Sequence, residues 1–193
     1  QSGVLPKSLN PCDTVISFPY RNNRDVIAEF EHLLNKNFNE ADLERFLKKY
    51  YKQIFAGKYD MIETQLWLRF PQLDINNKTR RLDILMRNAA ERDWDLIELK
   101  KENNIISTYR DIPVLSSRII GAIGQLRNYE RILQQDSVKR KMQEQGIEYY
   151  EPQLRLVIGG KPEIYIQQWR RLKHENENGL IISTSEEIIR EMD

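Results

Sequence analysis

The pattern of apolar and polar positions predicts two neighbouring β-strands near the middle of the chain, each containing an ionisable residue. The first strand covers residues 81–85 (RLDIL) and the second covers residues 95–100 (DLIELK). A strand that only fills a core would carry an aliphatic residue in place of Asp83 or Glu98. The polar link at 87–93 is short enough to join the two strands as a hairpin.

Alternation along a strand determines which side chains lie together. Glu98 and Lys100 are two positions apart and therefore project from one face of their strand, while Asp83 can face Glu98 across the hairpin. Two adjacent carboxylates repel each other unless a cation lies between them, and Mg²⁺ is commonly bound by one or two carboxylates plus water. The two strands therefore predict a divalent metal site with an amine beside it.

The N-terminal part of the chain predicts an irregular arm, two amphipathic helices and a first strand. Three prolines within residues 1–20 favour an extended arm, with a short strand at 14–18. Asn23 and Asn39 suit the N-cap positions of the two helices, and an alternating pattern at 64–70 predicts the strand. The apolar stripes of the helices contain Val26, Phe30, Leu33 and Leu34, and Leu43, Phe46, Leu47 and Tyr50.

The segment after Lys100 predicts an irregular region followed by a long helix. Residues 101–111 are polar and are expected to form a flexible lip beside the site. Pro113 suits the first turn of the helix, in which Gly121 and Gly124 reduce helix propensity and so indicate close approach of another segment. The buried stripe of this helix is expected to contain Ile119, Ile120, Ile123, Leu126, Tyr129 and Leu133.

The last part of the chain alternates strand and helix patterns, which predicts a parallel extension of the sheet. Thr184 and Glu187 have the spacing of a capping box at the start of the final helix. The strands are expected at 154–159 and 180–182, and the helices at 162–172 and 185–192. The whole chain therefore predicts an α/β fold with a mixed central β-sheet flanked by α-helices.

Composition narrows the class of protein only slightly. The chain has 193 residues, enough for a real core, and its 30 Lys and Arg against 29 Asp and Glu give a net charge of +1. A site for a polyanion therefore needs local basic clusters, such as those at 80–81 and 100–101. The alternative is that these clusters are ordinary charged surface in contact with solvent. The single cysteine, Cys12, excludes an internal disulfide. With no apolar run of membrane length and no signal-peptide pattern, we expect a cytoplasmic protein without membrane contact.

The domain organisation is expected to be simple. Residues 1–38 are assigned to an N-terminal arm and accessory helix, and residues 39–193 to the main domain. The first residue is Gln1 rather than methionine, so we expect a processed product or a fragment of a longer protein. If so, a regulatory domain or a partner protein is expected outside this chain.

The order of Asp83 and then Glu98-x-Lys100 on the next strand resembles the PD-(D/E)xK nuclease superfamily. Within it, the chain is most similar to the Shedu family of bacterial anti-phage defence nucleases. The resemblance rests on the two strands together with residues 39–47 (NEADLERFL) and 121–129 (GAIGQLRNY). The proline that names the motif is replaced by Leu82.

The resemblance extends from residue 39 to about residue 190 and implies a restriction-endonuclease-like core. It also implies that Mg²⁺ or Mn²⁺ supports nicking or cutting of double-stranded DNA, in anti-phage defence and within a homo-oligomer. In this superfamily a glutamate of the helix before the sheet often contributes to the metal site, and the matching residue here is Glu40. The alternative role for Glu40 is to complement the dipole of its helix as an acid in the first turn. Gln125 and Tyr129 lie on one helical face and resemble a Gln-x-x-x-Tyr motif that holds the active site and substrate strand, although such a pair also serves packing.

The expected mechanism follows from these charges. Asp83, Glu98 and the backbone carbonyl of Leu99 are expected to bind the metal. Lys100 is expected to orient or deprotonate the attacking water with a lowered pKa, and Gln125 to hold that water or a phosphate oxygen. Contacts to DNA are assigned to Arg81, Lys101 and Tyr129.

Two rival residues and two other functions stay open. Asp74 is a rival for Asp83, but it lies in a turn rather than a strand. Lys101 is a rival for Lys100, which strand alternation favours. From another functional class, the same fold can act as a catalytically inactive module for DNA binding or oligomerisation. A DNA repair or junction-resolving nuclease shares the chemistry and differs in the shape of DNA that it accepts.

Overall fold

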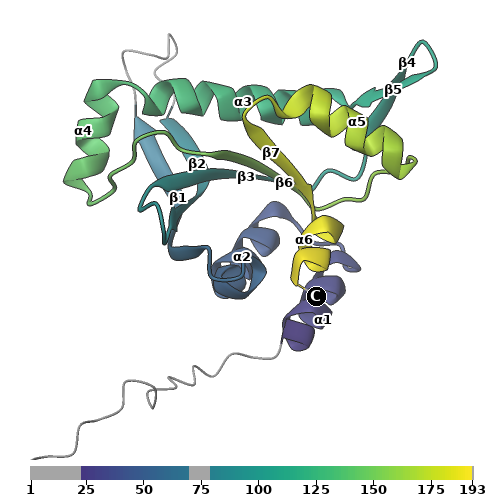
Figure 1. The fold of residues 1–193 in the computed structure, drawn as a ribbon, viewed down its shortest axis with the longest axis horizontal. Helices are drawn as coiled ribbons and strands as arrows, with labels where there is room; N and C mark the ends of the chain where they lie inside the picture. The colour runs from purple at the N-terminus through teal and green to yellow at the C-terminus, as the bar shows by residue number, and fades with distance from the viewer. Residues whose placement is uncertain (1–22, 70–78, 193) are drawn as a thin grey trace, which may run out of the picture.

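The computed structural model describes residues 23–69 and 79–192. Its centre is a five-stranded sheet with the strand order β1-β2-β3-β6-β7 (Figure 1). The expected N-terminal arm and the rival acid Asp74 lie outside the described residues. The strands of the sheet are β1 (Tyr59–Arg69), β2 (Thr79–Asn88), β3 (Trp94–Lys100), β6 (Leu154–Ile158) and β7 (Leu180–Thr184).

The sheet is mixed, as the sequence predicts. β1, β2 and β3 are antiparallel neighbours, and the β2–β3 register places Ile84 opposite Ile97. β6 is parallel to β3, and β7 is parallel to β6. β3 is therefore the middle strand, bonded to an antiparallel strand on one side and to a parallel strand on the other.

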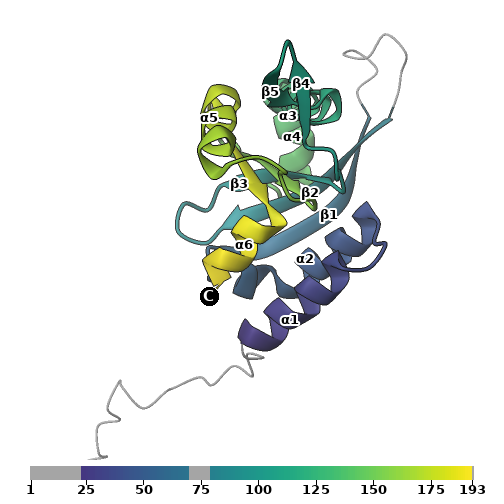
Figure 2. The same ribbon diagram turned by 90° about the vertical axis from the view of Figure 1, so that its right-hand side faces the viewer.

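Helices cover both faces of the sheet (Figures 1 and 2). They are α1 (Asn23–Leu34), α2 (Glu40–Ile54), α3 (Ser117–Leu133), α4 (Asp136–Glu144), α5 (Ile166–Glu177) and α6 (Ser185–Met192). α3, α4 and α5 pack on one face, and α1, α2 and α6 pack on the other. Because strand side chains alternate, Leu96 and Leu156 enter the first core while Ile97 and Val157 enter the second.

α1 shares a core with α2 and α6. Its Val26 and Phe30 are buried, and the Phe30 ring stacks on Phe46 of α2 with the centroids 4.6 Å apart. Asn23 is the first residue of α1, and its side-chain amide donates to the carbonyl of Met192 at 3.1 Å instead of acting as the predicted N-cap. Within the described residues, α1 therefore packs as an accessory helix on the face of the sheet that α2 and α6 cover.

Side-chain caps fix the starts of α2 and α6. At α2, the Asn39 side chain accepts from the backbone N–H of Asp42 at 2.9 Å, and Asp42 accepts from Asn39 in return. At α6, the Glu187 carboxylate accepts from the Thr184 N–H at 2.9 Å, and the Thr184 hydroxyl accepts from the Glu187 N–H at 3.3 Å. The predicted cap at Asn39 and the predicted capping box at Thr184 and Glu187 are both confirmed.

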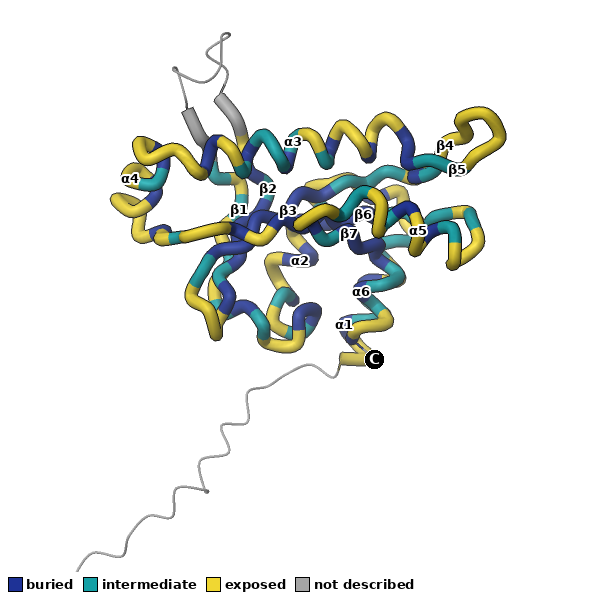
Figure 3. Tube along the Cα trace, turned by 45° about the horizontal axis from the view of Figure 1, so that its top comes forward, coloured by how far each residue is buried: buried dark blue, intermediate teal, exposed yellow. Residues whose placement is uncertain are grey.

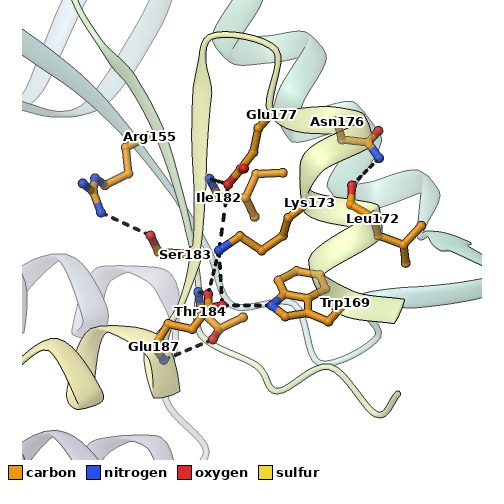
Figure 4. A network of polar contacts seen from close by, with 10 residues as sticks. All are labelled: Arg155, Trp169, Leu172, Lys173, Asn176, Glu177, Ile182, Ser183, Thr184 and Glu187. Carbon is orange, nitrogen blue, oxygen red and sulfur yellow. Dashed lines mark hydrogen bonds and ion pairs between the residues drawn. The ribbon is translucent and has the colours of Figure 1, made fainter. Parts of the chain in front are cut away.

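Glu187 also joins α5 to α6 (Figure 4). Its Oε1 accepts from the Trp169 indole at 3.0 Å and from Lys173 Nζ at 3.2 Å. Burial raises the pKa of Glu187, but the Thr184 N–H and these two donors outweigh it, so the pKa lies below its ordinary value. We expect Glu187→Ala to lower the free energy of unfolding in urea by about 2 kcal/mol. Glu191→Ala, at an exposed position of the same helix, should change it by less than about 0.5 kcal/mol; equal losses would contradict the prediction.

The segment after β3 forms a second, two-stranded sheet instead of the expected flexible lip. In it, β4 (Ile106–Tyr109) pairs antiparallel with β5 (Ile112–Leu115). Pro113 lies in β5, so it is not in the first turn of a helix; α3 begins after it, with Ser116 as its N-cap. Ile120, which was expected in the buried stripe of α3, is 47% exposed, whereas the other predicted stripe residues pack into the core.

The close approach expected at the two glycines of α3 occurs elsewhere. A Cβ on Gly121 or Gly124 would meet nothing within 4 Å, so that prediction is wrong. By contrast, a Cβ on Gly160 would lie 2.2 Å from the backbone carbonyl oxygen of Glu102. The loop after β6 therefore packs directly against the backbone that follows β3. α5 begins at Ile166, later than expected, and α4 was not predicted.

Replacing Gly160 by alanine is expected to lower the free energy of unfolding by about 2 kcal/mol, because the backbone around Glu102 must shift to admit the methyl group. Gly121→Ala is a matched control in open space, and it should raise that free energy by up to about 1 kcal/mol through helix propensity. Urea denaturation measures both. A larger loss for Gly121→Ala than for Gly160→Ala would show that the close approach lies in α3 after all.

Candidate active site

Asp83 lies where β2 separates from β3. The register between the strands ends at the pair Ile84 and Ile97. Beyond it, the Asp83 carboxylate itself accepts a hydrogen bond from the backbone N–H of Leu99 at 3.1 Å. In β1, on the other side of β2, Gln65 has a positive φ of 58° and interrupts the regular strand opposite Asp83. Asp83 therefore occupies an irregular point of the sheet, and its carboxylate lies against β3.

Glu98 is almost fully buried, with 1% of the residue exposed. Its Oε1 accepts from Lys100 Nζ at 2.6 Å, whereas its Oε2 is buried and makes no hydrogen bond within the described residues. Burial, and after it the negative charge of Asp83, raises the pKa of Glu98 to about 7. Because a buried carboxylate oxygen without a donor is unfavourable, this atom is suited to contact a cation.

Lys100 is a charged ammonium in the metal-free protein. Burial lowers its pKa, but the hydrogen bond to Glu98 and the negative charges of Glu98, Glu40 and Asp83 outweigh burial, so its pKa is raised above the ordinary value. The lowering was expected beside a bound cation, and the metal-free protein has the opposite shift. Three acids around one amine produce the opposite shift, and the charged form is suited to orient a water or to stabilise a phosphoryl oxygen.

α2 brings its first residue to the end of β3. The Oε1 atom of Glu40 accepts from the backbone N–H of Lys101 at 3.4 Å. The negative charge of Glu40 contributes to the raised pKa of both Glu98 and Lys100. Glu40 is exposed, so it lies at the rim of the cluster rather than inside it. The structure thus brings together all four of the charged residues that were expected at the metal site or beside it.

Lys101 points toward the connection between α1 and α2. Its Nζ donates to the Asn37 side chain at 2.7 Å and lies 5.4 Å from the ring centroid of Phe38. Lys100, in contrast, contacts Glu98 directly. The geometry therefore favours Lys100 over Lys101 as the lysine of the site.

Gln125 and Tyr129 of α3 form a chain of hydrogen bonds that reaches β2. The amide of Gln125 donates to the Tyr129 hydroxyl at 2.9 Å, and this hydroxyl donates to the carbonyl of Arg81 at 3.1 Å. The Arg81 guanidinium in turn lies 3.6 Å from Asp83. Tyr129 is 4% exposed, so its hydroxyl contacts the backbone beside Asp83 rather than an open surface. The arrangement supports a positioning role for this pair in place of the expected DNA contact by Tyr129.

Removing the hydroxyl with Tyr129→Phe is expected to slow any metal-dependent DNA cleavage by about 10-fold, because the backbone that carries Asp83 loses a supporting hydrogen bond. The rate on supercoiled plasmid measures the effect. Tyr149→Phe is the matched control, since the Tyr149 hydroxyl donates to the carbonyl of Leu133 at 2.7 Å, at the far end of α3. An equal loss of rate in both variants would contradict a specific positioning role.

The donor set is small but chemically consistent with a hard divalent ion. The described residues contain no group of three or more His, Cys, Asp or Glu side chains arranged to hold a metal. The set expected here has two carboxylates, Asp83 and Glu98, together with the carbonyl of Leu99. Mg²⁺ keeps several waters and commonly uses one or two carboxylates, and an all-oxygen set suits Mg²⁺ or Mn²⁺. The unpartnered Oε2 of Glu98 is the observation that fits such an ion.

A cavity of about 580 Å³ lies at the opposite end of β3. It is lined by the β2–β3 link and by residues after α4, among them Asp93, Tyr149 and Tyr150. None of the expected site residues lines it. The carboxylate cluster therefore lies at a strand end rather than in this cavity.

Comparison with known proteins assigns no family to the chain. No family model matches it, and no curated protein matches it. None of the helices in the described residues is long and apolar enough to cross a membrane. The case for a function therefore depends on the residues around Glu98.

Proposed function

We propose that this protein is a metal-dependent DNA endonuclease that hydrolyses phosphodiester bonds with Mg²⁺ or Mn²⁺. The observation that carries the proposal is the carboxylate of Glu98, which is buried with one unpartnered oxygen, next to Asp83 and Lys100. A buried pair of carboxylates with one adjacent ammonium does not stabilise a core, because one negative charge is left without a compensating partner. Such groups are more often found at functional sites. The same three residues carry the resemblance to the PD-(D/E)xK superfamily.

In the proposed site, Asp83, Glu98 and the Leu99 carbonyl hold the ion. When bound, the ion would neutralise the two carboxylates and polarise a phosphoryl oxygen of the substrate. Lys100 donates from its ammonium to orient the attacking water or to stabilise charge on the phosphoryl oxygen. The Gln125 side chain, placed by its bond to Tyr129, is the group proposed to hold the water or a phosphate oxygen.

The groups around the site have supporting roles. Glu40, at the rim, is proposed as an outer ligand through water. Arg81, whose side chain is 40% exposed, and Lys101 are proposed to contact the DNA backbone, where cations supply most of the affinity. The site at a strand end, away from the cavity at the opposite end of β3, suits a polymeric substrate better than a small enclosed one.

The biological setting is proposed from the resemblance alone. Likeness to the Shedu family supports a role in bacterial anti-phage defence, a restriction-endonuclease-like core, action on double-stranded DNA in the cytoplasm, and assembly into a homo-oligomer. Each of these needs its own experiment. Sedimentation of the purified chain addresses the oligomer, and phage challenge of cells that express it addresses defence.

A plasmid assay tests the activity itself. Purified protein is mixed with supercoiled DNA in Mg²⁺, in Mn²⁺ and in EDTA, and the nicked and linear products are separated on a gel. We expect nicks or cuts with either metal and none in EDTA. Binding of the plasmid without any cleavage in both metals would overturn the proposal and favour the inactive DNA-binding module.

A further inference from the structure

We propose that the β4–β5 hairpin is a DNA-binding element that enters the major groove of a duplex and positions it over the site at the end of β3. This inference rests on the proposed nuclease function and deepens it. Figures 1 and 2 show the hairpin projecting from the body of the molecule, beyond the first turn of α3. It uses residues that are not part of the carboxylate cluster.

The base of the hairpin is fixed to the core. Ile105 and Leu115 are buried, and the N–H of Ser116 donates to the carbonyl of Ile105 at 2.8 Å. Between this base and the end of β3, Glu102 is held by an ion pair with Arg118 of α3 at 3.1 Å. The hairpin therefore projects from a base that is anchored in the core.

The tip is exposed and carries an aromatic and a cationic side chain. Tyr109 is 61% exposed and Ile112 is 53% exposed, and Figure 3 shows the tip as an exposed stretch. The guanidinium of Arg110 lies 5.3 Å from the ring centroid of Tyr109. Arginine is among the side chains that most often make specific base contacts in the major groove of a duplex.

The turn itself is strained in a way that glycine would relieve. Arg110 has a φ of 49° and Asp111 has a φ of 63°. Two-residue hairpin turns of this kind favour Asn-Gly, because L side chains are disfavoured in the left-handed region. No buried packing at this exposed tip requires an arginine. Backbone strain of this kind clusters at functional sites, which supports a role for the Arg110 side chain.

Shape and charge favour duplex DNA as the occupant. A two-stranded β-ribbon fits the major groove, where arginine binds guanine bidentately and apolar side chains contact the thymine methyl. The hydroxyls of Ser107 and Thr108 on β4 are exposed and can bond to either bases or phosphates. At the tip Arg110 and Asp111 balance each other, and Arg118 pairs with Glu102. The net positive charge of residues 100–118 therefore comes from Lys100 and Lys101, at the end of β3.

The test measures affinity without cleavage. Fluorescence anisotropy with a labelled duplex is carried out in the Glu98→Gln background, so that the readout does not depend on catalysis. We expect Arg110→Ala to weaken binding by about 10-fold, as for the loss of one bidentate base contact. The double change Arg110→Asn with Asp111→Gly should weaken binding equally while the protein stays at least as resistant to urea, because Asn-Gly suits the turn.

Two matched controls keep the test specific. Arg140→Ala changes an exposed arginine of α4. Tyr150→Ala changes a tyrosine that is 88% exposed and lies beside Lys139 of α4. Both should bind within about 2-fold of the parent, since isolated surface changes usually have small effects. Affinity of the Arg110 variants within that same range, or no binding of the duplex by the parent, would overturn the inference.

Two further outcomes separate this inference from other readings. If Tyr109→Ala changes the sedimentation of the protein and leaves DNA affinity unchanged, the tip is an interface with a second copy and the inference is overturned. If wild-type protein leaves plasmid intact in Mg²⁺ and Mn²⁺ while Arg110→Ala still loses duplex affinity, the nuclease proposal fails and the hairpin inference is supported.

Discussion

Replacing Glu98 by glutamine is expected to reduce the rate of plasmid cleavage by about 1000-fold or more. Glutamine keeps the shape of the side chain but removes the charge that would hold a cation beside Asp83. It also replaces the charged partner of Lys100 Nζ, 2.6 Å away in the wild type, with a neutral amide. The rate is measured as conversion of supercoiled DNA to nicked circles in Mg²⁺, with circular dichroism to confirm that the fold is retained.

Glu91→Gln is the matched control for this loss. Glu91 lies in the β2–β3 link, at the opposite end of β3, where its carboxylate accepts from the Asn88 amide at 3.0 Å. This variant should cleave within about 2-fold of wild type. Full cleavage by Glu98→Gln, or by a Lys100→Ala protein, would remove the proposed mechanism.

The metal-free protein is expected to lose stability as pH rises, through the ionisation of Glu98. The pKa of this carboxyl is about 7 in the folded state against an ordinary value of 4.5, because of burial and then the charge of Asp83. Below pH 4.5 the group is protonated in both states, so the favourable contribution of the neutral form is fully present. Between pH 4.5 and about 7 the unfolded chain ionises first, and about 3 kcal/mol of stability is lost.

Urea denaturation in EDTA measures this loss. Relative to wild type, Glu98→Gln should gain about 3 kcal/mol between pH 4.5 and a pH one unit above the folded pKa of about 7, because glutamine does not ionise. Glu91→Gln should show no such pH-dependent difference. Saturating Mg²⁺ should restore the stability of wild type at the higher pH and leave Glu98→Gln unchanged. Parallel pH profiles of wild type and Glu98→Gln would contradict the raised pKa.

Much of the architecture follows from periodicity in the sequence. The apolar strands around Asp83 and Glu98, and those at β6 and β7, are buried on both faces, which gives continuous aliphatic runs that cannot be mistaken for loops. Helix starts are predicted at Asn39 and at the Thr184–Glu187 pair, because the capping hydrogen bonds are local and need no tertiary partner. The antiparallel and then parallel order of the sheet follows from the lengths of the connections.

The features that sequence did not reveal depend on tertiary contacts or on surface context. β4 is mostly exposed and β5 is mostly half-buried, so neither has a clear apolar alternation. Their Arg-Asp turn is not one of the favoured hairpin pairs. Pro113 is compatible with a two-stranded ribbon as well as with a helix start. A glycine in a helix lowers propensity whether or not anything approaches it, so Gly121 gave no information about its surroundings.

Within the candidate site, sequence predicted which residues meet but not their electrostatic balance. Strand alternation and the hairpin bring Asp83, Glu98 and Lys100 together. The direction of the Lys100 pKa shift depends on how many acids surround the amine, and that count includes Glu40 from a distant helix. The link from Tyr129 to the Arg81 carbonyl is likewise a contact between elements far apart in the chain.

The central position of β3 has a consequence for how the protein opens. Edge strands such as β1 and β7 exchange their amide hydrogens through local fluctuations, whereas a strand bonded on both sides exchanges only when most of the fold is lost. Residues 96–99 should therefore be among the slowest-exchanging amides. Partial fraying at either edge would leave the Asp83 carboxylate against β3, so the two carboxylates separate only when the whole domain unfolds.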